Sequence, residues 1–275
     1  MRSFIVKIFI LSTILCTSVL QSQGLDPSWK KSVILAESKN DSIYQPIATG
    51  FLVLFQNHIF IVTNKHVAER RGLFFRFNSK SLSNPTIRLS IDTLLSFINL
   101  PWAVSSTSDV AAIPLIFYPS LSRYRDSIDV KFLGISLFKD WNYINEGDDV
   151  FILGFPLGVG VSARFSAVYR YGIIALKEIE GNYLIDSNIF PGNSGGPVFM
   201  KPSIFDYRKG ALGEGTVGYL VGIDSAFLPY SDVAISLQTR RPRVIFEENS
   251  GLAVVYSTDA IVKLLSDYIK THKPN

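Results

Sequence analysis

Ser194 has the surroundings of a nucleophile. It stands between Gly192-Asn193 and Gly195-Gly196, and Pro191 and Pro197 close the turn on either side. Glycine permits backbone angles and close approaches that other residues resist, and proline prevents a regular helix through the segment. Such a turn can direct a serine hydroxyl into a cleft and aim several backbone N–H groups at one point, as a nucleophile beside an oxyanion hole requires. By itself, the stretch is equally compatible with a glycine-rich connector between two strands.

A base and an orienting acid for this serine stand upstream of it. His66 follows an apolar stretch at 58–63, and Asp109 opens another at 110–116. A serine hydroxyl is a weak nucleophile until a neighbouring base takes its proton, and histidine can then return that proton to the leaving amine. Taken singly, His66 is also compatible with a solvated loop residue and Asp109 with a turn residue. Together, the order His, Asp, Ser is that of chymotrypsin-type triads.

Other chemistries fit the sequence poorly. The Gly-x-Ser-x-Gly elbow of α/β-hydrolases opens a helix and needs an acid and then a histidine downstream. Here Pro197 and a β-rich run follow the serine, and the only later histidine is His272. The chain has no Gly-Lys-Ser/Thr phosphate motif, three scattered histidines and one cysteine. We therefore expect no nucleotide, metal or other cofactor.

The motifs around these three residues resemble those of trypsin-like serine peptidases, in the style of the bacterial HtrA proteases. Thr63-Asn64-Lys65-His66-Val67 resembles the histidine motif, Asp109-Val110-Ala111-Ala112-Ile113 the aspartate strand, and Pro191–Pro197 the serine motif. The resemblance covers roughly residues 33–265. It implies a His66, Asp109, Ser194 triad, an oxyanion hole formed by the N–H groups of Gly192 and Ser194, and polypeptide substrates.

The resemblance also implies a place for the substrate pocket. Its base would lie near Asn188, and Ile223, Asp224, Ser225 and Ala226 would form its wall and the edge strand that pairs with an extended peptide. Asp186 is expected to lie outside it. We expect an uncharged side chain of modest size before the scissile bond. The residues after Ser194 are expected to complete a second barrel without adding a PDZ module.

The pattern of short apolar runs separated by turns predicts an all-β fold. The resemblance implies two six-stranded antiparallel Greek-key barrels, one at 25–137 with His66 and Asp109 and one at 138–275 with Ser194. Strands are expected at 49–55 and 58–63, joined by a tight Gln56-Asn57 turn. A C-terminal helix is expected at 258–269, where apolar residues recur on one face.

Composition restricts the location and the partners. Hydrophobic residues make up 47% of the chain, charged residues 18%, and the formal charge of +4 is too small to indicate nucleic acid binding. Residues 1–24 have a basic start and a short apolar run, which is typical of a signal peptide. We expect export to the periplasm or the medium after cleavage near Gly24. The alternative is retention as a membrane anchor, and lipidation at Cys16 is not expected because bulky Leu15 precedes it.

Three functions remain open at this point. The first is an exported serine endopeptidase acting through an acyl-enzyme. The second is a catalytically silent binding or scaffold protein of the same fold with a blocked cleft, although a silent copy would be expected to lose at least one triad residue. The third is an esterase or acyl-transfer enzyme using the same triad.

Overall fold

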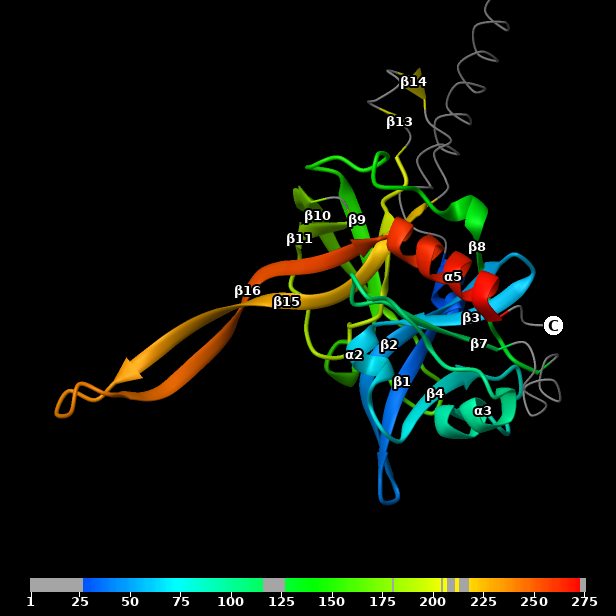
Figure 1. Cartoon of the computed structure of the whole chain (residues 1–275), viewed down its shortest axis with the longest axis horizontal. Coiled ribbons are helices and arrows are strands. Elements are labelled where there is room, and N and C mark those ends of the chain that lie inside the picture. The colour runs from blue at the N-terminus through cyan, green and yellow to red at the C-terminus, as the bar shows by residue number, and fades with distance from the viewer. Residues whose placement is uncertain are drawn as a thin grey trace, which may run out of the picture.

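The computed structural model describes residues 27–115, 127–179, 181–203, 205–206, 211–212 and 218–272. The expected signal peptide at 1–24 lies outside these residues. Two β-sheets lie side by side, and the C-terminal helix crosses the front of their junction in Figure 1. No helix in the described ranges is long and apolar enough to cross a membrane.

The first half of the chain forms one eight-stranded sheet with the order β5-β4-β1-β2-β3-β7-β6, in which β8 pairs with β2. The strands are β1 (Val33–Asn40), β2 (Ile43–Phe55), β3 (His58–Thr63), β4 (Leu73–Asn78), β5 (Thr86–Ser90), β6 (Ala103–Val104), β7 (Ala111–Pro114) and β8 (Leu133–Gly134). The short helices are η1 (Pro27–Ser32), α2 (Lys65–Ala68), α3 (Ile91–Ile98) and η2 (Ile135–Leu137).

The expected tight turn at Gln56-Asn57 is confirmed. Both residues have positive φ, 48° and 64°, and Phe55 pairs directly with His58 across the hairpin. Two consecutive left-handed residues match the right-handed twist of the flanking strands. The turn therefore fixes the register of β2 against β3, and with it the position of the residues that follow β3.

The second half forms a closed antiparallel barrel with the order β10-β11-β16-β15-β12-β9. The barrel strands are β9 (Asp149–Gly154), β10 (Val168–Ile179), β11 (Asn182–Asp186), β12 (Pro197–Met200), β15 (Leu220–Ile235) and β16 (Pro242–Ser257). A small pair, β13 (Phe205–Asp206) and β14 (Ala211–Leu212), the turn η3 (Pro156–Gly158) and helix α5 (Thr258–His272) complete it. The expected all-β architecture, six-stranded barrel and short C-terminal helix are confirmed. The sheet of the first half has eight strands where six were expected.

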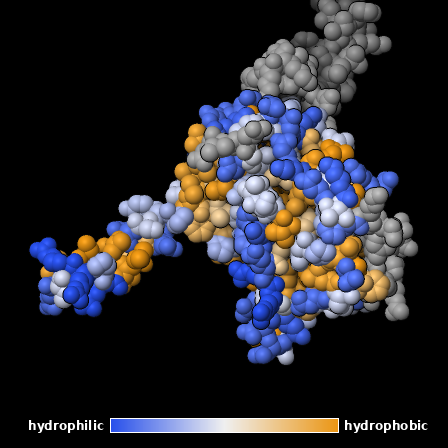
Figure 2. All heavy atoms as spheres, in the orientation of Figure 1, coloured by the Kyte–Doolittle hydropathy of each residue, from blue (hydrophilic) through white to orange (hydrophobic). Residues whose placement is uncertain are grey.

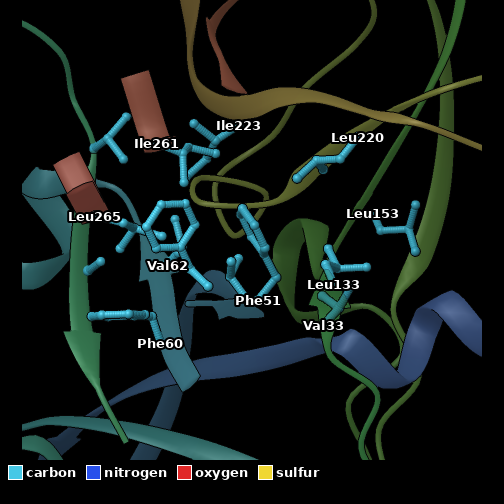
Figure 3. Packing of buried hydrophobic residues seen from close by; sticks show 14 of the residues in the cluster. Val33, Phe51, Phe60, Val62, Leu133, Leu153, Leu220, Ile223, Ile261 and Leu265 are labelled. Carbon is cyan, nitrogen blue, oxygen red and sulfur yellow. The ribbon is translucent and has the colours of Figure 1, made fainter. Parts of the chain in front are cut away.

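A shared hydrophobic core joins the two sheets. Phe51 and Val62 of the first sheet meet Ile223 of the barrel and Ile261 and Leu265 of α5 in Figure 3, and all five side chains are buried. Fully burying an aliphatic or aromatic side chain of this size stabilises a fold by about 1.5–3 kcal/mol. This core fixes the ends of β3 and β7 near the turn before β12, where the candidate site residues lie.

Strands β15 and β16 are much longer than the barrel requires. Beyond the barrel they continue as a two-stranded ribbon that projects far from the body of the molecule in Figure 1. In Figure 2 its tip is hydrophilic, and a hydrophobic stretch follows between the tip and the body of the molecule. We call this ribbon, residues 228–249, the arm.

Candidate active site

His66 and Asp109 are brought together by strand pairing. His66 lies in α2, directly after β3, and Asp109 precedes β7, whose Ala111 pairs with Thr63 of β3. The His66 ring nitrogen Nδ1 and Asp109 Oδ2 are 2.7 Å apart, and the His66 backbone N–H donates to Asp109 Oδ1 at 3.1 Å. Asn64 Nδ2 donates to the Asp109 carbonyl at 2.8 Å. The carboxylate thereby orients the imidazole through Nδ1, and Nε2 remains available to accept a proton.

A third partner of Asp109 comes from the barrel. The Ser225 hydroxyl of β15 donates to Asp109 Oδ2 at 2.6 Å. Burial alone would raise the pKa of Asp109, but the hydrogen bonds from the His66 side chain, the Ser225 hydroxyl and the His66 N–H outweigh it and hold the pKa below its usual value. The carboxylate therefore stays charged over the pH range in which a histidine base works. Sequence reasoning placed Ser225 only in the pocket wall, because nothing in the local sequence links it to Asp109.

The turn that carries Ser194 is held by both sheets. The Thr49 N–H of β2 donates to the Ser194 carbonyl at 2.8 Å, and the Thr49 hydroxyl donates to the Gly192 carbonyl at 2.7 Å. On the other side, the Gly195 N–H donates to the Asp224 carbonyl and the Asp224 N–H donates to the Gly196 carbonyl, each at 2.9 Å. The position of Ser194 is therefore set by β2 and β15 together.

Two glycines of the turn are required by sterics. Gly192 has φ 103° and Gly195 has φ 84°, conformations that strain an L side chain. A Cβ on Gly192 would lie 2.2 Å from the Phe155 carbonyl oxygen, and one on Gly195 would lie 2.1 Å from the Thr49 carbonyl oxygen. The expectation of close backbone approach at this turn is confirmed at both positions.

The turn also leaves two backbone donors free. Within the described part of the chain, the N–H groups of Gly192 and Ser194 donate no hydrogen bond, although the Gly192 carbonyl is bound by Thr49. Ser194 is partly exposed, and across the same residues no hydrogen bond joins its hydroxyl to His66. Free N–H groups beside a serine can receive the negative charge that develops on an acyl oxygen. Hydrogen bonds between base and nucleophile are often long before substrate binds.

The residues expected to form the substrate pocket differ in their burial and contacts. Asn188 is exposed, and its carbonyl accepts a hydrogen bond from Arg170. Ile223 is buried in the core between the sheets. Ala226, which lies two residues before the arm on β15, is exposed. Ser225 contacts Asp109 as described. Asp186 is exposed.

Asp224 is the most unusual of these residues. Its side chain is fully buried, and neither carboxylate oxygen has a hydrogen-bond partner. Burial raises its pKa to about 8. Burial and the nearby Asp224 also raise the pKa of Tyr183, whose buried hydroxyl has no partner either. The carboxyl group of Asp224, whose backbone binds the Ser194 turn, is therefore protonated at neutral pH. The local sequence does not indicate this burial.

Removal of the Ser225 hydroxyl tests its part in orienting the acid. In Ser225→Ala we expect the pKa of Asp109 to rise and kcat/KM for peptide hydrolysis to fall by about tenfold, since a hydrogen bond to a charged group contributes about 1.5–3 kcal/mol. Ser136→Ala, which alters an exposed serine of η2 away from the site, is the matched control. Equal rates for the two variants would show that Ser225 has no positioning role.

Asp224 makes a pH-dependent contribution to stability. Its folded pKa of about 8 lies above the usual 3.8, so between those values the unfolded chain loses a proton that the folded chain keeps. The free energy of unfolding therefore falls by about 1.4 kcal/mol per pH unit as pH rises through this window, and the penalty is absent below about pH 4. Asp224→Asn should remove this pH dependence. The free energy of unfolding of the variant minus that of the wild type should therefore be about 3 kcal/mol larger at pH 7 than at pH 5.

Denaturant unfolding of both proteins at the two pH values measures this difference. Asp232→Asn, which alters an exposed acid on the same strand, is the control and should show no such dependence. A stability difference between Asp224→Asn and wild type that is the same at pH 5 and pH 7 would contradict the prediction.

Comparison with known proteins places the fold. No family model and no curated protein matches the chain. Among solved structures, a serine endoprotease from Yersinia pestis is similar with a TM-score of 0.51 and 16% identity over 88% of this chain and 64% of that one. The HtrA-type protease AlgW, in a structure with a tripeptide, is similar with a TM-score of 0.50 and 14% identity over 90% of this chain and 62% of that one.

These likenesses define a class by its fold. The chain shares the trypsin-like fold of HtrA-type serine proteases, at an identity that relates the architecture alone. It spans less than two thirds of the length of either solved protein.

Proposed function

We propose that the protein is an exported serine endopeptidase that hydrolyses peptide bonds through His66, Asp109 and Ser194. The observation that carries the proposal is the hydrogen bond between His66 Nδ1 and Asp109 Oδ2, 2.7 Å long and supported by Ser225. A carboxylate bound to Nδ1 stabilises the tautomer whose Nε2 can accept a proton. The trypsin-like fold and the glycine turn around Ser194 give further support.

The proposed reaction has two stages. His66 takes the proton of the Ser194 hydroxyl as the serine oxygen bonds to the substrate carbonyl carbon, and the resulting oxyanion is bound by the N–H groups of Gly192 and Ser194. His66 then protonates the departing amine, and the C–N bond breaks to leave an acyl-enzyme. His66 then takes a proton from water as the water oxygen bonds to the ester carbon. It passes that proton to the serine oxygen as the acyl C–O bond breaks, which releases the acid product and restores the free serine and the neutral ring. None of these steps requires a cofactor.

A fluorophosphonate probe tests the proposal directly, because it forms a covalent bond only with an activated serine. We expect one label per chain in the wild type and none in Ser194→Ala. Ser136→Ala, which alters an exposed serine in η2, is the matched control and should label fully. If folded wild-type protein takes up no label, the peptidase proposal fails and the silent binding protein becomes the better explanation.

Hydrolysis of matched amide and ester substrates separates the peptidase from an esterase. A peptidase should hydrolyse both an unfolded protein and an acyl ester, whereas an esterase should hydrolyse the ester alone. Export is a separate proposal, drawn from the character of residues 1–24. N-terminal sequencing of the exported chain, with a start near residue 25, would support it.

A further inference from the structure

The arm has strand edges that no other described strand pairs with, and they begin at the candidate active site. Strand β12 pairs with β15 only as far as Ile223, and β11 pairs with β16 only as far as Leu252. From Pro229↔Asn249 to Ile235↔Pro242 the two strands pair only with each other in the part of the chain that the structure describes. A two-stranded ribbon is marginally stable alone in water, so a third strand would stabilise it.

The free edge of β15 is continuous with the Ser194 turn. Asp224 uses its backbone N–H and carbonyl to bind Gly196 and Gly195, and its neighbour Ser225 binds Asp109. The next residue, Ala226, is exposed, and the free edge runs from it to Ile235. A chain added along this edge would therefore end beside the Ser194 hydroxyl.

The two edges of the arm differ in character. Strand β16 carries Arg243, Glu247 and Glu248 on the arm, and charged residues protect an edge against pairing. The arm part of β15 has Asp232 as its only charged residue. Its exposed side chains include Tyr230 at 59%, Val233 at 41% and Ile235 at 58% of full exposure, with Ile245 and Phe246 close by on β16. The β15 edge is the one suited to accept a strand, and its surroundings suit apolar side chains.

We propose that the β15 edge of the arm binds an extended polypeptide as an added strand, on the N-terminal side of the scissile bond. This inference rests on the proposed function and narrows its substrate class to long, unfolded chains with apolar residues. The direction follows from the barrel, in which every strand pair is antiparallel. An antiparallel chain ending at Ser194 lays its N-terminal residues along the arm. The ten residues from Ala226 to Ile235 span roughly 33 Å, enough for about ten substrate residues.

Peptides of graded length test the inference. One cleavage site, found by digesting an unfolded casein, is built into peptides with four, seven or ten residues before the scissile bond. In the wild type we expect kcat/KM to rise about tenfold or more from four residues to ten. The reason is that the added residues form main-chain hydrogen bonds with β15, each of which strengthens substrate binding slightly. Extension after the scissile bond should have no such effect. A flat response before the bond, or a rise only after it, would overturn the inference.

A shortened arm is the matched variant. Tyr230 and Glu248 pair directly, so residues 231–247 can be replaced by Asn-Gly, the preferred two-residue hairpin loop. We expect this variant to label with fluorophosphonate and cleave the four-residue peptide as the wild type does, with no gain from longer peptides. An equal gain in both proteins would refute a role for the arm. If the shortened protein misfolds, Val233→Ser combined with Ile245→Ser keeps the ribbon and should reduce the gain.

Binding separates failure of the arm from failure of catalysis. Fluorescence anisotropy of a labelled ten-residue peptide on Ser194→Ala should show binding that the shortened arm weakens about tenfold, whether or not the wild type hydrolyses peptides. If the wild type takes up no fluorophosphonate but the peptide still binds in an arm-dependent way, the peptidase proposal is refuted and the binding role of the arm is retained. No binding by either form overturns the inference. So does an arm-dependent dimer in sedimentation velocity, because the edge would then be an interface between two copies.

Discussion

His66→Ala is expected to reduce kcat/KM for peptide hydrolysis by about 10⁶-fold, the loss measured when the base of a serine triad is removed. The ring is bound to Asp109 through Nδ1, and in the proposed reaction its Nε2 takes the serine proton. Without it, the hydroxyl keeps its proton and attacks poorly. The measurement is initial-rate hydrolysis of an unfolded protein, calibrated by titration of folded chains.

His58→Ala is the matched control for this prediction. His58 starts β3 and His66 follows its end, so the two rings are separated by a strand of about 20 Å, and the control should hydrolyse at the wild-type rate. The double variant His66→Ala with Ser194→Ala should lose no more than either single variant, because the two residues act as a unit. Additive losses, or wild-type activity in His66→Ala, would rule out the proposed triad.

Asp109→Asn is expected to lower kcat by about 10⁴-fold while the fold is retained. The amide is nearly the same size, and with its oxygen at the Oδ1 position it still accepts from the His66 N–H. The NH₂ group then takes the place of Oδ2, which faces both Nδ1 and the Ser225 hydroxyl. This NH₂ group would donate to Nδ1 of His66 and place the ring proton on Nε2. That tautomer cannot accept the proton of Ser194, so the geometry is kept and the chemistry is lost.

Asp186→Asn provides the control, since Asp186 is an exposed acid of β11 and should be neutral for activity. Unfolding curves of Asp109→Asn and wild type establish that the rate loss is chemical. A loss of less than about tenfold would show that Asp109 does not set the tautomer of the base.

The sequence alone determined which groups are present and much of the local structure. Short apolar runs separated by turns specified an all-β chain, and Gln56-Asn57 specified a tight hairpin because few residues tolerate two consecutive positive φ angles. The spacing of Ile261, Leu265 and Tyr268 specified α5. The glycines around Ser194 announced a turn in which other backbone atoms come close, and the contacts at Gly192 and Gly195 explain why.

Only the tertiary structure decided which of these groups meet. His66 reaches Asp109 because β3 pairs with β7, and Ser225 joins them because the barrel packs against the first sheet; neither pairing is encoded in local spacing. The burial of Asp224 beneath the Ser194 turn follows from the same packing and could not be read from its neighbours. The arm escaped sequence reasoning for a related reason. Its residues have the composition of ordinary strands, and only the ends of β11 and β12 show that no other strand in the described part of the chain pairs with the arm.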